Sequence, residues 1–498
     1  MNCGYSSIAE AVFRHAEEAP DRLCIAVAKN ECTYREFTES CRRMMRAFRS
    51  LGIGKGDMVI AEAVQRADFF TVEFGLQMLG AVFVPVENRC AQVRIRSIAE
   101  SCGAKLVILQ KKAEESCGYD SMTWAALKEL SRDTEPEEGE LSFPEADAVS
   151  EILFSTGTTG KEKGIVISHR NDIAVAGNIM DGVGMRHGNV EMIPSPLNHS
   201  HGLRSAYSDL LGGGSVILVD SLMNLKRFFD MMDRYQVNSM DLVPAALSVI
   251  LRNSGDKLGE YREQLRYIEF GSAPMPEADR RTIRRLLPGI PLYNFYGSTE
   301  SGRVAVYNFN VQAPKDKCIG RPTANADIVM MDPSRRAVRS DAEHTGLIAC
   351  RGAMNMLCYW KDPVETERVS DGEFIYSNDE AYYDADGDII LLGRVGDVIN
   401  IGGKKVSPEE IEDSVRSLPE IADCGCIAVD DELTGKAAVL FVALKPGFAF
   451  DGKKIRDHIA SGLESYKIPR SILKTEQIPR SFNGKLLRRE LQKYYSSL

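Results

Sequence analysis

The stretch EILFSTGTTGKEKGIVISHRN, from Glu151 to Asn171, places six consecutive Ser, Thr and Gly residues between two apolar runs. These small residues are Ser155–Gly160, and Lys161 and Lys163 follow them. The apolar runs predict two strands, and a glycine-rich loop after a strand exposes backbone N–H groups that can surround an anion. We therefore predict that this strand–loop–strand unit binds phosphate.

The spacing of this loop differs from that of kinases and GTPases. A Walker A loop has four residues between its two glycines, followed by Lys and then Ser or Thr. Here two residues separate Gly157 from Gly160, and Glu162 follows Lys161. The Walker A interpretation is therefore excluded, and a plain connector of small residues remains the alternative to a phosphate loop.

Around the loop, β-rich apolar runs alternate with helical patterns over three-quarters of the chain. The predicted strands are Met58–Val64, Val82–Glu87, Lys105–Gln110, Ser215–Asp220, Ser239–Pro244, Arg266–Ser272 and Leu292–Gly297. Ala67–Ala81 is one of the predicted helices, and the acidic stretch Ser131–Ala148 is predicted to be a surface loop. This alternation is typical of α/β layers with buried strands. We predict a large, multi-sheet, layered α/β domain over residues 1–395.

The last hundred residues follow a different pattern. A predicted strand, Asp388–Arg394, leads into a helix that Ser407 caps, with Pro408 at its first position and Glu410 completing a capping box. A strand pair, a helix and a final strand and helix are expected after it. We predict a small α+β domain over residues 396–498, with its boundary near Gly396.

The bulk composition indicates a class of protein and excludes others. A chain of 498 residues is too long for one compact core, so two or more domains are expected. The net charge of −10 argues against a general nucleic-acid binder. The local run Arg280, Arg281, Arg284 and Arg285 is interpreted as a solvated helix face.

The cysteines and the start of the chain indicate the compartment. The 12 cysteines are scattered, and no C-x-x-C pair meets a second one, so a structural zinc site is not expected. The first twenty residues follow an amphipathic helix pattern rather than a signal peptide, and no apolar run reaches membrane length. We expect a cytoplasmic protein without a membrane span. Its oligomeric state is left open.

The loop STGTTGKEKG resembles the phosphate loop of the adenylate-forming (ANL) superfamily, which includes acyl-CoA ligases, carrier-loading adenylation domains and luciferases. Further stretches resemble the other motifs of this family, in the same order. They are PLNHSHGL (Pro196–Leu203), FGSAP (Phe270–Pro274), NFYGSTE (Asn294–Glu300), TGLIACRG (Thr345–Gly352), FIYSNDEA (Phe374–Ala381), GRVGDVINIGGKKVSPEEIE (Gly393–Glu412) and PRSFNGKLLRREL (Pro479–Leu491). The resemblance covers nearly the whole chain and favours the AMP-forming acyl-CoA synthetase branch.

This resemblance implies a site in which a carboxylate attacks the α-phosphate of ATP. The loop would hold the β- and γ-phosphates through Ser155, Thr156, Gly157, Thr158, Thr159, Gly160 and Lys161. Gly271, Ser272 and Ala273 would wall the adenine, and Tyr296 would stack on it. Thr299 would contact the α-phosphate, and Glu300 would bind Mg²⁺. Asp379 and Arg394 would hold the ribose, although Asn378 replaces the usual glycine before Asp379. Lys163 is either a further phosphate contact or a surface lysine.

The resemblance also implies two half-reactions with a mobile small domain. Lys485 would bridge the carboxylate and the α-phosphate during adenylation. The domain would then rotate, so that Gly402 and Gly403 approach the site and let a pantetheine arm pass. Gly396 takes the hinge position, where the family normally has Asp or Lys.

The acid is weakly specified by the sequence. His199 matches the family residue that gates the acyl pocket, and a metal pair of His199 with His201 is a minor alternative. Arg204 and Arg303 lie where the family borders this pocket. An inward arginine would indicate an acid with a second carboxylate, but an outward one is favoured here. The expected substrate is a small carboxylic acid.

The expected function is therefore ATP-dependent activation of a carboxylic acid to an acyl-adenylate, with transfer to the thiol of coenzyme A. The stretch Tyr466–Arg470 is similar to stand-alone CoA ligases. The alternative is a stand-alone adenylation enzyme that loads a separate carrier protein. A catalytically inactive homologue used for binding is the third hypothesis, and the presence of all the expected site residues argues against it.

Overall fold

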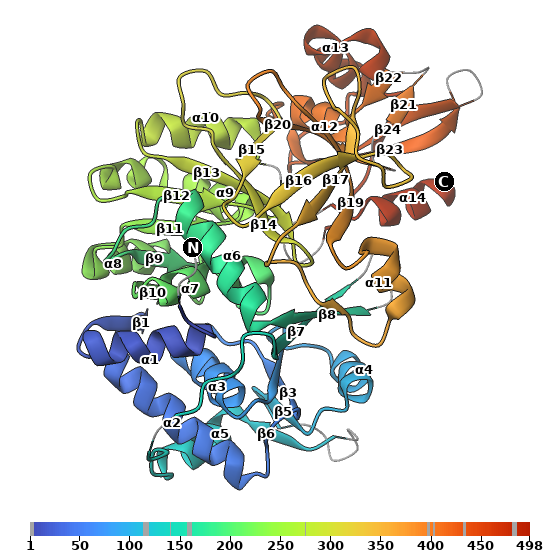
Figure 1. The fold of residues 1–498 in the computed structure, drawn as a ribbon. Coiled ribbons are helices and arrows are strands. Elements are labelled where there is room, and N and C mark those ends of the chain that lie inside the picture. The colour runs from blue at the N-terminus through green and yellow to red at the C-terminus, as the bar shows by residue number, and fades with distance from the viewer. Residues whose placement is uncertain are drawn as a thin grey trace.

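The computed structural model describes residues 4–112, 119–139, 141–156, 162–273, 275–395, 399–401, 404–431, 435–480 and 486–498. Over these residues the strands form three sheets, and helices pack on their faces (Figure 1). The architecture is a mixed α/β one, as the alternating pattern predicts.

The largest sheet carries the nucleotide-site candidates. Across it, the strands run in the order β16 (Asp327–Met331), β17 (Gly346–Arg351), β19 (Phe374–Tyr383), β20 (Ile389–Arg394), β15 (Cys318–Pro322), β14 (Gly302–Asn308), β13 (Leu292–Ser298), β12 (Tyr267–Phe270), β11 (Ser239–Leu242), β9 (Val190–Ile193), β10 (Ser215–Leu218), β1 (Leu23–Val27) and β2 (Asn30–Thr33). From β1 to β13 the neighbours along this order are parallel, and from β13 to β17 they are antiparallel. The change of direction therefore falls at β13.

The second sheet contains the strands that flank the predicted phosphate loop. Its order is β18 (Cys358–Tyr359), β8 (Glu162–Ser168), β7 (Val149–Thr156), β4 (Val82–Val86), β3 (Met58–Glu62), β5 (Leu106–Leu109) and β6 (Ser121–Thr123). The third sheet is smaller, and its order is β22 (Lys404–Val406), β21 (Ile399–Ile401), β24 (Gly435–Leu444) and β23 (Ile421–Asp431), with β25 (Ser471–Lys474) paired to β24.

Most helices belong to the first 395 residues. They are α1 (Ile8–Glu18), α2 (Tyr34–Ser50), α3 (Ala67–Met78), α4 (Gln92–Cys102), α5 (Trp124–Arg132), α6 (His169–Gly182), α7 (Ser200–Leu211), α8 (Leu225–Tyr235), α9 (Pro244–Ser254), α10 (Glu277–Leu286) and α11 (Pro363–Val369), with the 3₁₀ turn η1 (Lys257–Tyr261). The others are α12 (Pro408–Arg416), α13 (Gly452–Gly462) and α14 (Arg488–Ser496), with the 3₁₀ turn η2 (Ser465–Lys467). Each strand predicted from the sequence is present, and so is the helix predicted over Ala67–Ala81.

The apolar cores fall into two groups along the chain. Side chains alternate along β24, so that Ala438, Leu440 and Val442 enter one core and Val439 and Phe441 enter another on the opposite face. These two cores draw on residues from position 399 onward, and the other cores of the described chain draw on residues up to position 391. The third sheet and helices α12 to α14 lie together at the upper right of Figure 1. This separation supports a domain division between residues 395 and 396, which we retain as a proposal.

One predicted local feature of the small domain is wrong. Ser407 precedes α12 and Pro408 occupies its first position, but the Ser407 side chain accepts no capping bond. Its hydroxyl donates to Glu409 Oε2 at 2.6 Å. The Glu410 carboxylate, expected to complete the capping box, instead pairs with Lys317 at 2.5 Å and Lys467 at 2.9 Å. Two ammonium groups therefore replace the predicted capping interaction.

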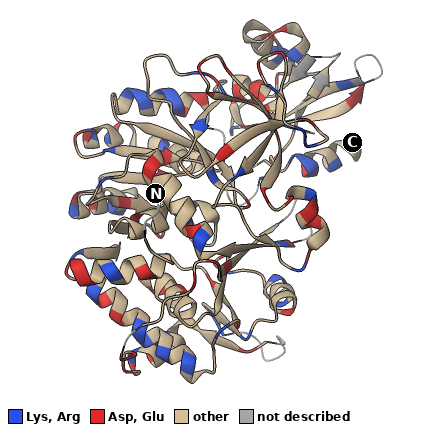
Figure 2. Ribbon diagram, viewed as in Figure 1, with Lys and Arg blue, Asp and Glu red and all other residues tan. Residues whose placement is uncertain are grey.

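Charged residues are distributed over the whole molecule. Figure 2 shows Lys and Arg interspersed with Asp and Glu on the helices of both the lower and the upper parts of the ribbon. The chain has 61 Lys and Arg residues against 71 Asp and Glu residues. Over the described residues, no helix combines the length and the apolar character needed to cross a membrane.

Candidate active site

The hairpin between β13 and β14 carries two of the predicted site residues. Thr299 and Glu300 lie at its tip, both half-buried, between the end of β13 and the start of β14. A Cβ atom on Gly297 would lie 1.8 Å from the Gly302 carbonyl oxygen, so only glycine lets the two strands close here. The close approach of the two strands thus fixes the backbone positions of Thr299 and Glu300.

Three predicted residues meet beside this hairpin. The Tyr296 hydroxyl donates to Asp379 Oδ2 at 2.7 Å, and Arg394 Nε lies 3.3 Å from Asp379 Oδ1. Asp379 and Arg394 are directly paired in the register of β19 and β20. Burial raises the pKa of the Tyr296 phenol well above its usual value, and the Asp379 charge raises it further. The three side chains therefore form one polar group, contributed by strands far apart in the sequence.

The predicted adenine wall lies at the end of the neighbouring parallel strand. β12 ends at Phe270, which pairs with Asn294 of β13, so Gly271 and Tyr296 reach the same edge of the sheet. A Cβ on Gly271 would lie 2.9 Å from His201 Cε1. Ser272 has a left-handed φ of +71° and is exposed. Ligands in open α/β sheets bind at the carboxyl ends of parallel strands, and this edge is such a place.

The strands on both sides of the phosphate loop form an antiparallel pair, in which Ser155 lies opposite Lys163 and Thr156 opposite Glu162. The rest of the predicted loop lies outside the described residues, as does the side chain of Thr156. Lys163 is not a solvated surface lysine, because only 13% of its side chain is exposed. Its ammonium pairs with the Glu365 carboxylate and lies 5.2 Å from the centre of the Tyr359 ring.

Two residues that the sequence analysis did not single out join this part of the site. The Tyr359 hydroxyl donates to Glu300 Oε1 at 2.7 Å. Arg368 and then Lys163 lower the pKa of the Glu365 carboxyl to about 2, so it stays ionised opposite the lysine. The sequence around both residues contains no glycine-rich loop, so no local pattern predicted that they belong to the site. Only the pairing of β18 with β8 brings them to the site.

The two histidines at the start of α7 have different surroundings. His199 is the N-cap residue of α7, and burial, then Arg94 and His201, lower its pKa to about 4, so its imidazole is neutral at pH 7. His201 Nε2 lies 2.6 Å from Asp241 Oδ1. Within the described chain, the group of side chains arranged like a metal site contains neither histidine. It consists of Asp384, Asp386 and Asp388, and the Lys315 ammonium lies 2.5 to 2.8 Å from all three.

The preference for outward arginines at positions 204 and 303 is wrong. The Arg204 side chain is 3% exposed and pairs with Glu151 at 2.5 Å and Asp172 at 2.7 Å. The Arg303 side chain is 8% exposed, and it pairs with Glu269 at 2.5 Å. Each buried guanidinium has its own carboxylate partner, as buried charges require. Neither arginine therefore needs a second carboxylate from the substrate.

Lys485, Gly402, Gly403 and the predicted hinge Gly396 lie outside the described residues. Ala273 is described and half-buried at the end of the adenine wall.

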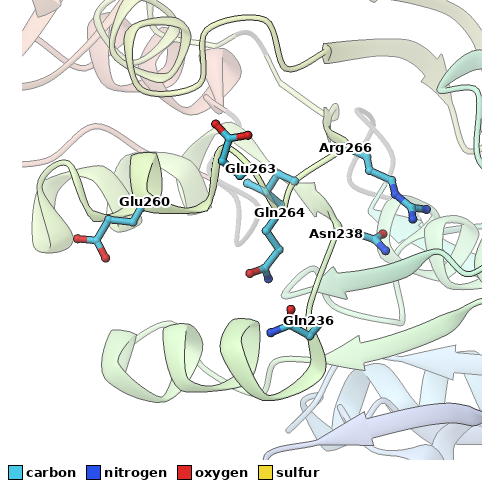
Figure 3. A pocket seen from close by; sticks show the side chains of 7 residues that line it. Gln236, Asn238, Glu260, Glu263, Gln264 and Arg266 are labelled. Atoms are coloured by element: carbon cyan, nitrogen blue, oxygen red, sulfur yellow. The ribbon is translucent and has the colours of Figure 1, made fainter.

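A hollow of about 570 Å³ lies elsewhere on the molecule (Figure 3). Its lining includes Asn238 and Arg266, which precede β11 and β12, so it lies at the opposite ends of these strands from Gly271. Its amides bind the backbone: Gln264 Nε2 donates to the carbonyls of Met232 and Val237 at 3.0 and 2.8 Å. These side chains connect loops, and the hollow is not part of the candidate site.

Comparison with known proteins agrees with this geometry. A family model described as AMP-binding enzyme matches residues 12–360, and one described as AMP-binding enzyme C-terminal domain matches residues 410–485. The chain is 26% identical to 4-coumarate–CoA ligase 3 of Arabidopsis thaliana, over 96% of this chain and 90% of that protein. It is also 26% identical to 2-succinylbenzoate–CoA ligase of Geobacillus kaustophilus, over 95% of both chains.

Solved structures share the fold. The o-succinylbenzoate CoA synthetase of Bacillus subtilis, in complex with its acyl-adenylate intermediate, aligns with a TM-score of 0.86 at 21% identity, over 97% of both chains. The same synthetase in complex with ATP and a magnesium ion aligns equally well, over 97% of this chain and 99% of that one. Since the first family model covers well over half of the sequence, the chain belongs to the AMP-binding enzyme family, as an AMP-forming ligase on the acyl-CoA ligase branch of the adenylate-forming superfamily.

Proposed function

We propose that this enzyme activates a small carboxylic acid with ATP and transfers the acyl group to the thiol of coenzyme A. The observation that carries the proposal is the meeting of Tyr296, Asp379 and Arg394 at the sheet edge that also carries Gly271 and Glu300. A carboxylate held by a phenol and a guanidinium can accept hydrogen bonds from the two hydroxyls of a ribose. The base and the phosphates would lie along the edge next to it.

In the first half-reaction, a carboxylate oxygen of the acid attacks the α-phosphorus, and the bond to the pyrophosphate oxygen breaks. Both reactants are anions, so the site has to offset their repulsion and the charge that develops in the transition state. Thr299 would donate to an α-phosphate oxygen. Ser155 and the loop up to Lys161 would receive the β- and γ-phosphates, and Lys485 would contact both the acid and the α-phosphate.

The residues present fit a magnesium ion. In the part of the chain that the structure describes, the Glu300 carboxylate has one hydrogen-bond partner, the Tyr359 hydroxyl on Oε1, which leaves Oε2 available. Carboxylate oxygens are the ligands that Mg²⁺ prefers, together with phosphate oxygens of a nucleotide. Glu300 would hold the ion, which would neutralise charge on the phosphates when bound.

In the second half-reaction, the thiol sulfur attacks the acyl carbon, the bond from that carbon to the AMP oxygen breaks, and the thiol proton is released to solvent. We propose that the small domain rotates about Gly396 between the two steps, and that Gly402 and Gly403 then border the pantetheine arm. Glycine at a pivot absorbs large φ and ψ changes with little strain. The neutral imidazole of His199 borders the acid in both steps.

Coenzyme A is the first choice of acceptor, and a separate carrier protein is the alternative. Lys467, in the stretch similar to stand-alone CoA ligases, is held by Glu410 and Glu464, both at 2.9 Å. The lysine therefore keeps η2 attached to α12, a structural role that either acceptor could use. For this reason the choice depends on an assay rather than on this residue.

The test is pyrophosphate release from ATP over a library of carboxylic acids, with and without coenzyme A. We expect release with a subset of the acids, and faster AMP release when coenzyme A is added. Stimulation by a carrier protein with a free pantetheine thiol, but not by free coenzyme A, would favour the alternative. An enzyme that never cleaves ATP between its α- and β-phosphorus atoms would contradict the proposal.

Two variants separate the half-reactions. Lys485→Ala should abolish adenylation and still transfer the acyl group from a supplied acyl-adenylate. Gly396→Pro should impair one half-reaction far more than the other, because proline removes the freedom of φ at the pivot. Equal losses in both half-reactions would argue against Gly396 as the hinge.

A further inference from the structure

A five-residue segment, Met356–Trp360, joins the hairpin that carries Glu300 to the strand that leaves the phosphate loop. At one end, Met356 N donates to the Glu300 carbonyl oxygen at 2.8 Å. Further along, Leu357 N donates to Val166 O at 2.9 Å, and Trp360 N donates to Gly164 O at 2.7 Å. The segment thus bonds through its backbone to both the hairpin and β8. A displacement of β8 would be transmitted to Glu300 through these bonds.

The side chain of Tyr359 repeats this connection between the same two elements. Its hydroxyl donates to Glu300 Oε1, and the Lys163 ammonium lies over its ring at 5.2 Å from the centre. Tyr359 as a whole is 4% exposed, so its ring is fixed by packing against Ile165 and Ile167. Glu365 holds Lys163 from the other side. One phenol therefore contacts both the candidate metal ligand and the first described lysine after the loop.

A carboxylate that binds a metal is normally oriented by a second residue, and loss of that residue weakens metal binding. A hydrogen bond on Oε1 fixes the rotation of the Glu300 carboxylate and leaves Oε2 as the ligand atom. We propose that Tyr359 is a positioning residue for Mg²⁺–ATP, which orients Glu300 and keeps it in register with β8 through Lys163. This inference rests on the proposed function, because it takes Glu300 as the metal ligand.

The test compares Tyr359→Phe with a matched control, Tyr376→Phe. Phenylalanine keeps the ring under Lys163 and removes only the hydroxyl. Tyr376, which is half-buried on β19, also donates its hydroxyl to a carboxylate, Asp371 Oδ2 at 2.6 Å. Both variants thus lose one phenol–carboxylate bond, and only one of these bonds reaches Glu300.

The first readout is the binding of Mn²⁺ in the presence of ATP, followed by electron paramagnetic resonance without any acid. We expect Tyr359→Phe to weaken Mn²⁺ binding about 10-fold, with wild-type affinity in Tyr376→Phe. Thermal melting of each variant checks that the fold is retained. The second readout is the Mg²⁺ concentration that gives half-maximal pyrophosphate release, which should rise in Tyr359→Phe while KM for the acid is unchanged.

The outcomes distinguish the two proposals. Unchanged Mn²⁺ affinity in Tyr359→Phe, or an equal loss in Tyr376→Phe, would overturn the role of Tyr359 and leave the proposed function intact. A wild-type protein that binds ATP and Mn²⁺ but activates no acid would contradict the proposed function, while the effect of Tyr359→Phe could still be measured. A wild-type protein that binds no Mn²⁺ with ATP would contradict both.

Discussion

Buried charged residues are where the sequence was least informative. The motifs predicted that Tyr296, Asp379 and Arg394 come together, because each lies at a recognisable position of a family motif. They did not predict the partners of Arg204 and Arg303, since those partners lie on strands and a helix elsewhere in the sequence. A long charged side chain next to a predicted pocket can face the ligand or an internal carboxylate, and only the tertiary structure distinguishes these cases.

Arg303 allows a test of this distinction. Its guanidinium donates to Glu269, to Ser205 Oγ at 2.6 Å and to the His201 carbonyl oxygen at 3.0 Å. Arg303→Ala leaves a buried carboxylate without its cation, so the free energy of unfolding should fall by about 3–5 kcal/mol. Urea unfolding measures this loss. The profile of accepted acids should stay that of the wild type.

The matched control for this variant is Arg262→Ala, because Arg262 is exposed and, among the described residues, pairs only with the neighbouring exposed Glu263 at 3.4 Å. Its stability should stay within about 0.5 kcal/mol of the wild type. A stable Arg303→Ala protein with an altered acid profile would instead restore the idea that this arginine faces a second carboxylate of the substrate.

A second residue-scale prediction concerns pH. Burial raises the pKa of the Asp209 carboxyl to about 7. The charges of Glu269 and Asp241 also raise this pKa, whereas hydrogen bonds with Glu191 and Asn189 lower it. Between the unfolded value near 4 and this folded value, the folded state holds an extra proton. The contribution of this group to the free energy of unfolding is therefore fully present at low pH and is lost as pH rises through 7.

The variant Asp209→Asn keeps the shape of the side chain and removes the titration. We expect the titration of Asp209 to lower the free energy of unfolding of the wild type by roughly 2–3 kcal/mol between pH 5 and pH 8. In Asp209→Asn the decrease over this range should be smaller by the same amount. Asp230→Asn, on the exposed surface of α8, serves as the control. Wild-type stability that is constant or rises over this range would contradict the prediction.

At the scale of elements, the sequence predicted strands and helices well, because the spacing of apolar residues that distinguishes them is a local property of the chain. The run Met58–Val64 gave β3 and the run Leu292–Gly297 gave β13, each within two residues of its bounds. The order of the strands was not predictable, since β18 pairs with β8, and β4 with β7, only through long-range contacts. For the same reason, Tyr359 and Glu365 could not be assigned to the site beforehand. The prediction of a capping box at Ser407 was wrong because two lysines distant in the sequence pair with Glu410.

The β13–β14 hairpin provides a prediction at this scale. Gly297→Ala places a methyl group where the Gly302 carbonyl oxygen lies, so the hairpin has to open and shift Thr299 and Glu300. A small displacement of reacting groups costs about 100-fold in rate, and we expect at least this loss in pyrophosphate release. Gly54→Ala is the control, since a Cβ there meets nothing within 4 Å. Near-normal activity of Gly297→Ala would show that the hairpin tolerates rearrangement.

At the scale of the whole molecule, a contact joins the two predicted domains. Lys317, next to β15, pairs with Glu410 of α12 at 2.5 Å, and both side chains are about one-quarter exposed. A partly exposed pair of this kind contributes up to about 1 kcal/mol. It therefore favours the present arrangement of the domains over any rotated one, without preventing rotation.

Removal of this contact should shift the balance between the two half-reactions. We expect Lys317→Ala to raise the rate of one half-reaction relative to the other by up to about 5-fold, the ratio that 1 kcal/mol allows. Pyrophosphate release and acyl transfer from a supplied acyl-adenylate measure the two rates. Lys436→Ala, whose partner Asp430 belongs to the same domain, should leave the ratio unchanged. Equal changes in both rates would show that the contact does not select between arrangements.

The loop with Asp384, Asp386 and Asp388 has one further consequence. Its positive charge is supplied by Lys315, which is part of the chain and cannot dissociate from it. Treatment with a chelator such as EDTA therefore leaves this loop with its counter-ion in place. Under the proposed function, any inhibition by chelation is expected to originate at Glu300 and the nucleotide phosphates, with no contribution from unfolding of this loop.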